Sequence, residues 1–184
     1  MADPVARQRE TSPLEASKNS QPIKDRSMTG AQLMMETAAE RGIEVCFANP
    51  GTTEMPMVEA LDATPKIRPI LGLFEGVCTG AADGYGRMAG KPAMALLHLG
   101  PGLANGLCNL HNARRAHTPL LLVVGEHSTW HLPYDPPLAM DIEALAGTLK
   151  GWQRTTARAE PRRGHVRRHG GSPARASGDF DRAV

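Results

Sequence analysis

Apolar runs alternate with segments of helical periodicity through the middle of the chain. Four runs are apolar almost throughout and are bounded by glycine, proline or polar residues, which is typical of buried strands. The predicted strands cover Glu44–Ala48, Arg68–Phe74, Ala93–Leu99 and Leu120–Val124. Helices are predicted before, between and after these strands, because the other segments have apolar or small residues at helical spacing.

Capping and breaking residues set the predicted helix boundaries. Thr29 is a suitable N-cap for the first helix, and Gly42 can end it in a left-handed conformation. Thr52 or Thr53 can cap a short second helix. That helix is predicted over Met55–Leu61, and the later ones over Glu75–Met88, from the turn at Gly100–Gly102 through Arg115, and over Asp141–Leu149.

Strands that are apolar on both faces need helices on both faces. A parallel, doubly wound α/β sheet flanked by helices meets this need, so we expect this fold class. Ligands of such sheets bind at the carboxyl ends of the strands. Glycine and polar residues follow the predicted strands there: Asn49–Thr52, Glu75, His98–Gly102 and Gly125–His127. The sequence therefore predicts a ligand site at that edge.

The two ends of the chain differ in composition from the middle. Residues 1–27 contain no aromatic residue and mix charged residues with Pro, Ser and Gln, which is typical of a disordered tail. Residues 153–184 contain eight arginines and three acidic residues, a charge of +5 against +2 for the whole chain. We expect one domain over 28–152 and an Arg-rich tail that is disordered or translated in a shifted frame. A nucleic-acid-binding arm is the alternative for this tail.

The three cysteines bear on metal binding and on the cellular compartment. Cys46, Cys78 and Cys108 form no Cys-x-x-Cys pair and have no histidine at ligand spacing, which argues against a zinc site. Their apolar neighbours favour buried, reduced thiols in a cytoplasmic protein. The sequence has no apolar run of about 18 residues, so we expect no membrane span.

Glu75 stands between a predicted strand and a helix of unusually small residues. Glycines at 76, 80 and 84 lie on one face of that helix, because residues four apart are neighbours. Each glycine costs a helix about 1 kcal/mol relative to alanine, so three in register predict that another element approaches closely. A glutamate in a first helical turn can also simply complement the helix dipole.

Two glycine patterns raise the alternative of a dinucleotide site. Gly84–Ala89 matches G-x-G-x-x-A but falls late in a helix, whereas such glycines serve the turn after a strand. Gly100–Asn105 has the right context, yet Asn105 stands where the third small residue belongs. A dinucleotide-binding fold stays an alternative on these patterns alone.

Four segments, in order and with matching spacing, resemble the N-terminal pyrimidine-binding domain of thiamine-diphosphate-dependent enzymes. They are Phe47–Glu54, Phe74–Tyr85, Gly100–Asn105 and Thr118–Gly125. The resemblance extends over residues 28–152 and points to the branch of the acetolactate synthase large subunit and benzoylformate decarboxylase. Four separate matches are more specific than any single pattern.

The resemblance implies thiamine diphosphate as cofactor and assigns roles to individual residues. Glu75 matches the glutamate that hydrogen-bonds the aminopyrimidine ring and promotes loss of a proton from the thiazolium ring. Leu73, Phe74 and Val77 are expected to desolvate its carboxyl group. Glu75 and His98 are thus the expected catalytic residues, since His98 matches a histidine used in proton transfer.

The same resemblance assigns binding roles to residues of two loops. Gly51 and Thr52 match a turn near the thiazolium ring and substrate, while Pro101 and Asn105 match the segment facing the aminopyrimidine. Ordinary turn and cap chemistry is the alternative for these four residues, and a structural role is the alternative for His98. Asn105, Asn109 and Asn112 share a helical face that is either solvated or a dimer contact.

The chain also departs from the family pattern. Family members bind the diphosphate through Mg²⁺ on a C-terminal domain marked by Gly-Asp-Gly, and this sequence lacks that pattern. We therefore expect Mg²⁺ only through a missing domain, and weak cofactor binding and little activity from this chain alone. FAD accompanies thiamine diphosphate in some synthases and is a second cofactor to test.

The resemblance finally implies what the intact protein does. It is expected to be a homo-oligomer acting on a small 2-oxo acid by carboligation or decarboxylation, as in branched-chain amino acid biosynthesis. One alternative is a non-catalytic module that pairs with a full-length homologue through the glycine-bearing helix. The other is a nucleic-acid-binding protein that uses the basic tail.

Overall fold

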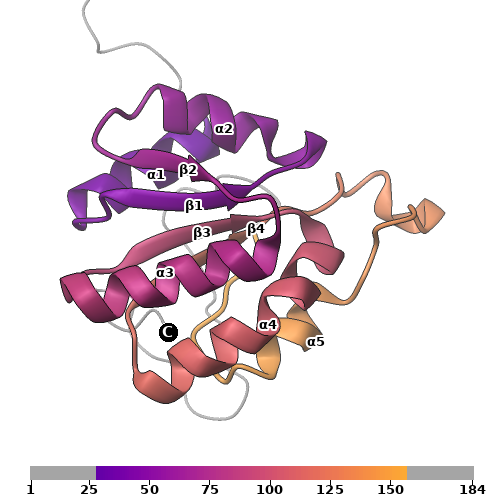
Figure 1. Ribbon diagram of the computed structural model, residues 1–184. Helices are drawn as coiled ribbons and strands as arrows, with labels where there is room; N and C mark the ends of the chain where they lie inside the picture. Colours follow the sequence, from indigo (N-terminus) through magenta and orange to yellow (C-terminus); the bar gives the residue numbers. More distant parts are fainter. Residues whose placement is uncertain (1–27, 157–184) are drawn as a thin grey trace, which may run out of the picture.

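A parallel four-stranded sheet between two helical layers forms the protein. The computed structural model describes residues 28–156. The strands run parallel in the order β2-β1-β3-β4 (Figure 1). They are β1 (Val45–Asn49), β2 (Arg68–Leu71), β3 (Ala93–Leu97) and β4 (Leu120–Val124). The doubly wound α/β fold predicted from the apolar runs is confirmed.

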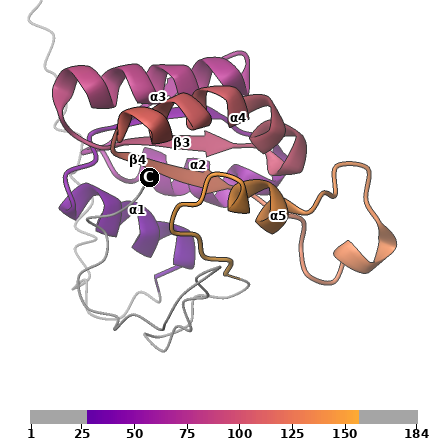
Figure 2. The ribbon, with the colours of Figure 1, turned by 90° about the horizontal axis from the view of Figure 1, so that it is seen from below.

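Helices cover both faces of the sheet. One layer contains α1 and α2, and the other contains α3 and α4, with α5 packed beside α4 (Figure 2). The helices are α1 (Gly30–Glu40), α2 (Met55–Asp62), α3 (Glu75–Ala89), α4 (Leu99–Ala116) and α5 (Ile142–Gly147), with short 3₁₀ turns η2 (Thr52–Glu54) and η3 (Leu132–Tyr134).

The central strand explains why the sequence is apolar without alternation. All five residues of β3 are 0% exposed, because helices pack on both of its faces. Met94 and Leu96 enter the core under α1 and α2, whereas Ala93 and Ala95 enter the core under α3 and α4. Full burial of a Leu or Met side chain stabilises a fold by about 1.5–3 kcal/mol, so these two cores hold the layers together.

The first helix has the ends that its sequence predicts. Thr29 and Gln32 form a reciprocal capping box, in which each side chain accepts a hydrogen bond from the other residue's backbone N–H. The chain leaves α1 through Gly42, whose φ of +85° is a left-handed value that glycine adopts without strain.

Three predicted boundaries near the carboxyl ends of the strands are wrong. β2 ends at Leu71 because the Asn49 side chain binds the Gly72 carbonyl at 2.7 Å and the chain then turns into α3. No side chain caps α2, since the Thr53 hydroxyl donates to the carboxylate of Glu54 instead. α4 begins at Leu99, so Gly100–Gly102 belongs to its first turn rather than to a preceding loop.

Some expectations concern parts of the chain that the structure does not describe. Residues 1–27 and 157–184 lie outside the described range, so the expectations for both tails stay predictions. Within residues 28–156, no helix has the length and apolar character that crossing a bilayer requires.

Candidate functional site

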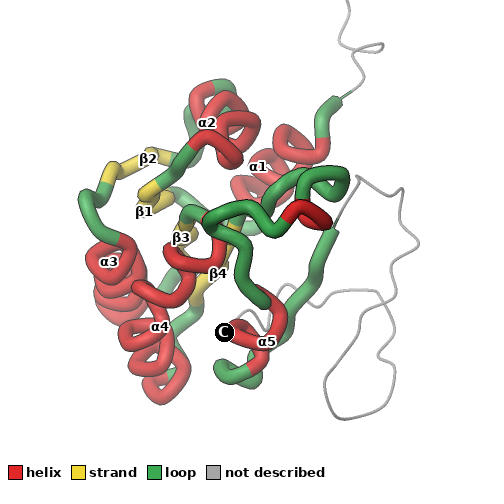
Figure 3. Tube along the Cα trace, turned by 90° about the vertical axis from the view of Figure 1, so that its right-hand side faces the viewer, coloured by secondary structure: helices red, strands yellow, loops and turns green. Residues whose placement is uncertain are grey.

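The order of the strands places a ligand-binding edge between β1 and β3. From β1 the chain passes to β2 on one side, then returns through α3 to β3 on the other side of β1. The carboxyl ends of β1 and β3 flank this reversal, where open α/β sheets bind their ligands. Figure 3 views these strands nearly end-on, with the loops that follow them toward the viewer.

His98 and Gly51 meet at this switch point. Gly51 follows β1 and His98 follows β3, and the imidazole lies so close over Gly51 that a β-carbon there would collide with the ring. Only glycine leaves room for the histidine at this position. Gly51 and His98, two of the residues that sequence reasoning assigned to the site, are therefore in contact.

A buried carboxylate fixes the histidine. Glu54 is 1% exposed, and its Oε2 atom lies 2.7 Å from Nδ1 of His98 and accepts a 2.8 Å hydrogen bond from the Gly51 backbone N–H. Its Oε1 atom accepts from the Thr53 hydroxyl at 2.6 Å. Each carboxylate oxygen thus has a partner, as burial of a charge requires. The carboxylate holds both the glycine turn and the imidazole in place.

Sequence reasoning did not assign a role to Glu54. The available signal was an acidic residue three positions after Gly51, within the turn that follows a buried strand. Its burial could not be inferred, because it depends on Gly125 at the end of β4, where a side chain would collide with the Glu54 carboxylate.

Backbone strain marks the start of α4. Leu99, directly after His98, has φ +55° although it is a leucine with 0% exposure. A left-handed conformation costs a non-glycine residue about 1–2 kcal/mol, and such strain concentrates at functional sites. It turns the chain sharply, so that His98 and the first turn of α4 both lie at the carboxyl edge of the sheet.

Glu75 lies at the same edge, in the first turn of α3. Its side chain is half-buried, and its Oε2 atom accepts a 3.0 Å hydrogen bond from Nδ2 of Asn105 on α4. Its Oε1 atom has no hydrogen-bond donor within residues 28–156 and faces Gly102, where a β-carbon would stand 3.2 Å away. One oxygen of the Glu75 carboxylate is therefore without a hydrogen-bond donor in the described part of the chain.

The glycines of α3 have different surroundings. Side chains or backbone of α4 lie close to Gly76 and Gly80, with Nδ2 of Asn109 3.0 Å from the position of a β-carbon on Gly80. Gly84 has nothing within 4 Å of that position. The predicted close approach is confirmed for the first two glycines, and no described residue makes such an approach at Gly84.

The asparagine face of α4 lies beside α3, with Asn105 and Asn112 exposed and Asn109 half-buried, so it is partly solvated and the dimer contact stays a prediction. Asn105 binds Glu75, Asn109 donates to the Gly76 carbonyl at 2.7 Å, and the Asn112 carbonyl accepts from Arg87.

Within residues 28–156, the apolar residues expected to desolvate Glu75 leave its surroundings open. Leu73, Phe74 and Val77 are 91%, 49% and 59% exposed, so they form an open apolar rim beside the carboxylate. Thr52 is also exposed, whereas Pro101 is half-buried in the first turn of α4.

Two of the three cysteines are buried thiols with a raised pKa. Burial raises the pKa of the Cys46 thiol to about 12, and burial is also the main reason that the pKa of Cys78 is raised. A raised pKa favours the protonated thiol, which is the less nucleophilic form. The expected burial of free thiols is confirmed for these two and wrong for Cys108, which is exposed.

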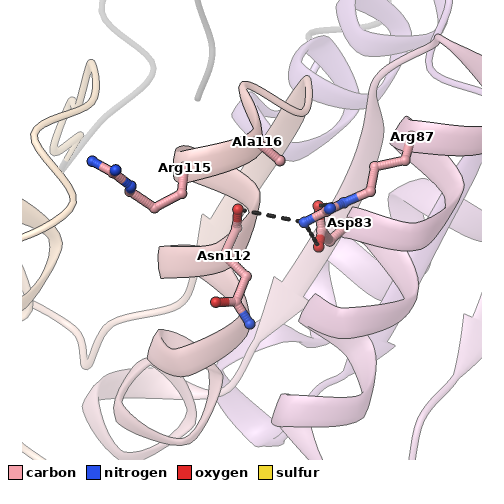
Figure 4. A pocket seen from close by; sticks show the side chains of 5 residues that line it. All are labelled: Asp83, Arg87, Asn112, Arg115 and Ala116. Atoms are coloured by element: carbon pink, nitrogen blue, oxygen red, sulfur yellow. Dashed lines mark hydrogen bonds and ion pairs between the residues drawn. The ribbon is translucent and has the colours of Figure 1, made fainter.

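A different polar cluster lies at the opposite ends of α3 and α4. Figure 4 shows an open pocket lined by Asp83, Arg87, Asn112, Arg115 and Ala116. Arg87 binds both carboxylate oxygens of Asp83, at 2.9 and 2.7 Å, and the Thr118 hydroxyl donates to Asp83 at 2.7 Å. Because these groups already pair with one another, the cluster joins the two helices to the start of β4.

The described part of the chain contains no group of three or more His, Cys, Asp or Glu side chains that could hold a metal ion. Glu75 offers an acceptor, and Gly102 leaves space beside it.

Comparison with known proteins is consistent with this edge as a cofactor site. Residues 28–150 match the family described as "Thiamine pyrophosphate enzyme, N-terminal TPP binding domain". The chain is 62% identical over 132 residues to the "Putative acetolactate synthase large subunit IlvX" of Mycobacterium tuberculosis, covering 72% of this chain and 26% of that protein. It is 34% identical over 126 residues to benzoylformate decarboxylase of Pseudomonas aeruginosa, covering 68% of this chain and 24% of the relative.

A solved structure has the same fold. The thiamine diphosphate-dependent 4-hydroxybenzoylformate decarboxylase of Rhodococcus jostii RHA1 aligns with a TM-score of 0.63 and 29% identity, over 68% of this chain and 24% of that one. The chain thus spans about a quarter of the length of these relatives. It belongs to the thiamine-pyrophosphate-dependent enzymes and contains their N-terminal cofactor-binding domain.

Proposed function

We propose that this chain forms the wall of a thiamine diphosphate site that binds the aminopyrimidine ring, with Glu75 as the ring-binding carboxylate. The observation that carries the proposal is the state of that carboxylate, with one oxygen held by Asn105 and the other free beside Gly102. Asn105 fixes the orientation of the group, and the free oxygen can share a proton with a ring nitrogen. Pro101, in the first turn of α4, lines the same edge.

The second half of the proposal concerns His98. When bound, thiamine diphosphate supplies the thiazolium carbon that reacts with a substrate carbonyl. His98 is held by Glu54 over Gly51, so its ring has one orientation and can hold or release a proton at its other nitrogen. Thr52 is assigned to substrate contact, and its exposure in the adjacent turn supports this role.

The intact protein is proposed to act on a small 2-oxo acid, by carboligation or as a lyase. The printed names of its relatives, an acetolactate synthase and a benzoylformate decarboxylase, support this class. The exposed rim of Leu73, Phe74 and Val77 supports a homo-oligomer in which another subunit covers Glu75. Mg²⁺ would then come with the diphosphate-binding part, and the free buried thiols agree with a cytoplasmic location.

Calorimetric titration of the purified chain tests the cofactor role. The family match covers only the N-terminal cofactor-binding domain, so we expect weak binding of thiamine diphosphate by these 184 residues, with a dissociation constant of about 0.1–1 mM. The free aminopyrimidine fragment is expected to bind about as well, and Mg²⁺ to change neither affinity. FAD, titrated in the same way, tests the second cofactor.

Matched variants make the test specific. Glu75→Gln is expected to weaken binding at least fivefold, whereas Glu59→Gln, on the exposed surface of α2, leaves it unchanged. Submicromolar binding by the chain, or equal binding by the two variants, would contradict the proposal.

A second candidate is a non-catalytic module that pairs with a full-length relative. The open rim beside Glu75 favours it, because such a rim needs a cover whether or not catalysis follows. Co-expression with a full-length relative distinguishes the two. A stable complex without any cofactor binding by this chain supports the module. The nucleic-acid alternative depends on the basic tail and stays a prediction.

A further inference from the structure

The two ring nitrogens of His98 have different surroundings. Nδ1 lies 2.7 Å from the carboxylate of Glu54, whose side chain is 0% exposed. Nε2 makes no hydrogen bond within residues 28–156, and the histidine side chain is 24% exposed. A neutral imidazole carries one proton, on one nitrogen or the other, so the position of that proton decides what the ring offers to a ligand.

Two further hydrogen-bond donors contact the Glu54 carboxylate. Oε2 accepts from the Gly51 backbone N–H at 2.8 Å, and Oε1 accepts from the Thr53 hydroxyl at 2.6 Å. An unprotonated Nδ1 of His98 would direct its lone pair at the lone pairs of Oε2, whereas Nδ1–H forms a charge-assisted hydrogen bond with that oxygen. The carboxylate therefore favours the proton on Nδ1.

Thr53 is the other described side chain with a polar atom near Nδ1. Its Oγ atom lies 3.4 Å from Nδ1 of His98 and 2.6 Å from Oε1 of Glu54. A hydroxyl group has one hydrogen to donate, and the shorter contact uses it. The Thr53 oxygen can then only accept from Nδ1–H, so within the described residues both polar contacts of Nδ1 favour the same position of the proton.

We propose that Glu54 is a positioning residue that sets the tautomer of His98, so that the neutral ring carries its proton on Nδ1 and presents Nε2 as a hydrogen-bond acceptor. This inference rests on the proposed role of His98. Nε2 can then take a proton from a hydroxyl group of a ligand, and the imidazolium so formed keeps Nδ1–H paired with the Glu54 carboxylate. The opposite tautomer would offer only a donor at Nε2.

Nitrogen NMR of the full chain without cofactor tests the tautomer. The ¹⁵N shifts of the seven histidines are recorded at a pH where their rings are neutral, and the His98 signals are assigned through correlations with its backbone. We expect Nδ1 of His98 to show the shift of a protonated ring nitrogen and Nε2 that of an unprotonated one. The reverse pattern, or an equal mixture of the two forms, would overturn the proposal without any variant having to fold.

Matched variants show whether Glu54 is the cause. The amide of Glu54→Gln can either accept from Nδ1–H or donate to an unprotonated Nδ1, so we expect the two tautomers of His98 to become comparably populated. Thr53→Val removes the hydroxyl but leaves the carboxylate beside Nδ1, so it is the control and is expected to keep the wild-type shifts. Unchanged shifts in Glu54→Gln, or equal changes in both variants, would overturn the proposal.

The NMR experiment is independent of the test of the proposed function. Calorimetric titration with thiamine diphosphate reports on the cofactor role of this chain, whereas the His98 shifts are measured with no cofactor present. A chain that fails to bind the cofactor but has the expected tautomer would contradict the proposed function alone. The reverse result would contradict only the role of Glu54.

Discussion

Glu54 connects more of the candidate site than any other single residue described above. Its two oxygens hold His98, the Gly51 amide and the Thr53 hydroxyl, and it is shielded from water. Removing one partner of a buried charged network leaves the others unpaired, which costs more than the net value of the hydrogen bonds themselves.

We expect Glu54→Ala to lower the free energy of unfolding by about 3–5 kcal/mol, because it orphans three polar groups. Glu54→Gln keeps the shape and one accepting oxygen, so about 1–2 kcal/mol is expected. Urea unfolding measures both, and the ¹⁵N shifts of His98 report whether its ring stays fixed. Glu59→Ala, exposed on α2, is the control; an equal loss in Glu54→Ala and the control would contradict the role of Glu54.

At the residue scale the sequence predicted types and positions better than contacts. Glu75, His98 and Gly51 could be picked out because they follow apolar strands at one edge. Glu54 could not be picked out, and neither could the contact between Asn105 and Glu75, because both contacts join elements far apart in the chain. The spacing of residues along the sequence does not show which oxygen of the Glu75 carboxylate lacks a hydrogen-bond donor.

At the scale of elements, α3 and α4 pack through small residues. A β-carbon on Gly106 would stand 2.8 Å from Cγ2 of Thr79 and 3.1 Å from Cδ1 of Leu97. The Thr79 hydroxyl also donates to the Gly106 carbonyl at 3.1 Å, and this hydrogen bond holds the two helices close together.

Two glycine-to-alanine variants separate helix propensity from packing. Gly84→Ala is expected to stabilise the chain by up to about 1 kcal/mol, since Gly84 has open space around it and alanine favours the helix. Gly106→Ala is expected to destabilise the chain, because the added methyl group collides with Thr79 and Leu97. The free-energy cost of this overpacking is expected to exceed the gain in helix propensity. Thermal unfolding of both variants measures this, and a stabilised Gly106→Ala would show that the interface yields.

The cluster at the other ends of these helices makes stability depend on pH. The hydrogen bonds from Arg87, with help from Thr118, hold the pKa of Asp83 below its usual value. A lowered folded-state pKa stabilises the protein above the unfolded pKa, and this contribution disappears as pH falls through the folded pKa. Asp83 therefore stabilises the native state at neutral pH and not in strong acid.

We expect Asp83→Asn to lower the free energy of unfolding by about 1–3 kcal/mol at pH 7, since charged hydrogen bonds are replaced by neutral ones. The difference from the wild type is expected to shrink below about pH 4. Urea titrations at both pH values measure it. Glu44→Gln, which breaks the exposed pair with Lys91, is the control and is expected to change little. A difference that does not depend on pH would contradict the assignment.

At the scale of the whole molecule, strand count, direction and helix order followed from the apolar runs alone. Such runs need cover on both faces, and the parallel sheet between two helical layers is the solution found. The apolar pattern did not show how much of the apolar surface the chain itself buries. The open rim at Leu73 and Val77 and the open edge of β4 appear only once the elements are assembled.

The boundaries of the folded unit give the last prediction. Both cores lie between Ala31 and Leu149, and one of them includes Ile142 and Leu145 of α5 and Leu149 just after that helix. A fragment of residues 28–156 keeps both cores and is therefore expected to unfold within about 2 °C of the full chain. A loss of about 1 kcal/mol in the free energy of unfolding would lower the melting temperature by several degrees in a domain of this size. A fragment of residues 28–140 loses α5 and is expected to lose about 2–4 kcal/mol. Calorimetry of the two fragments at equal concentration tests this, and equal melting temperatures would mean that α5 is not part of the folded unit.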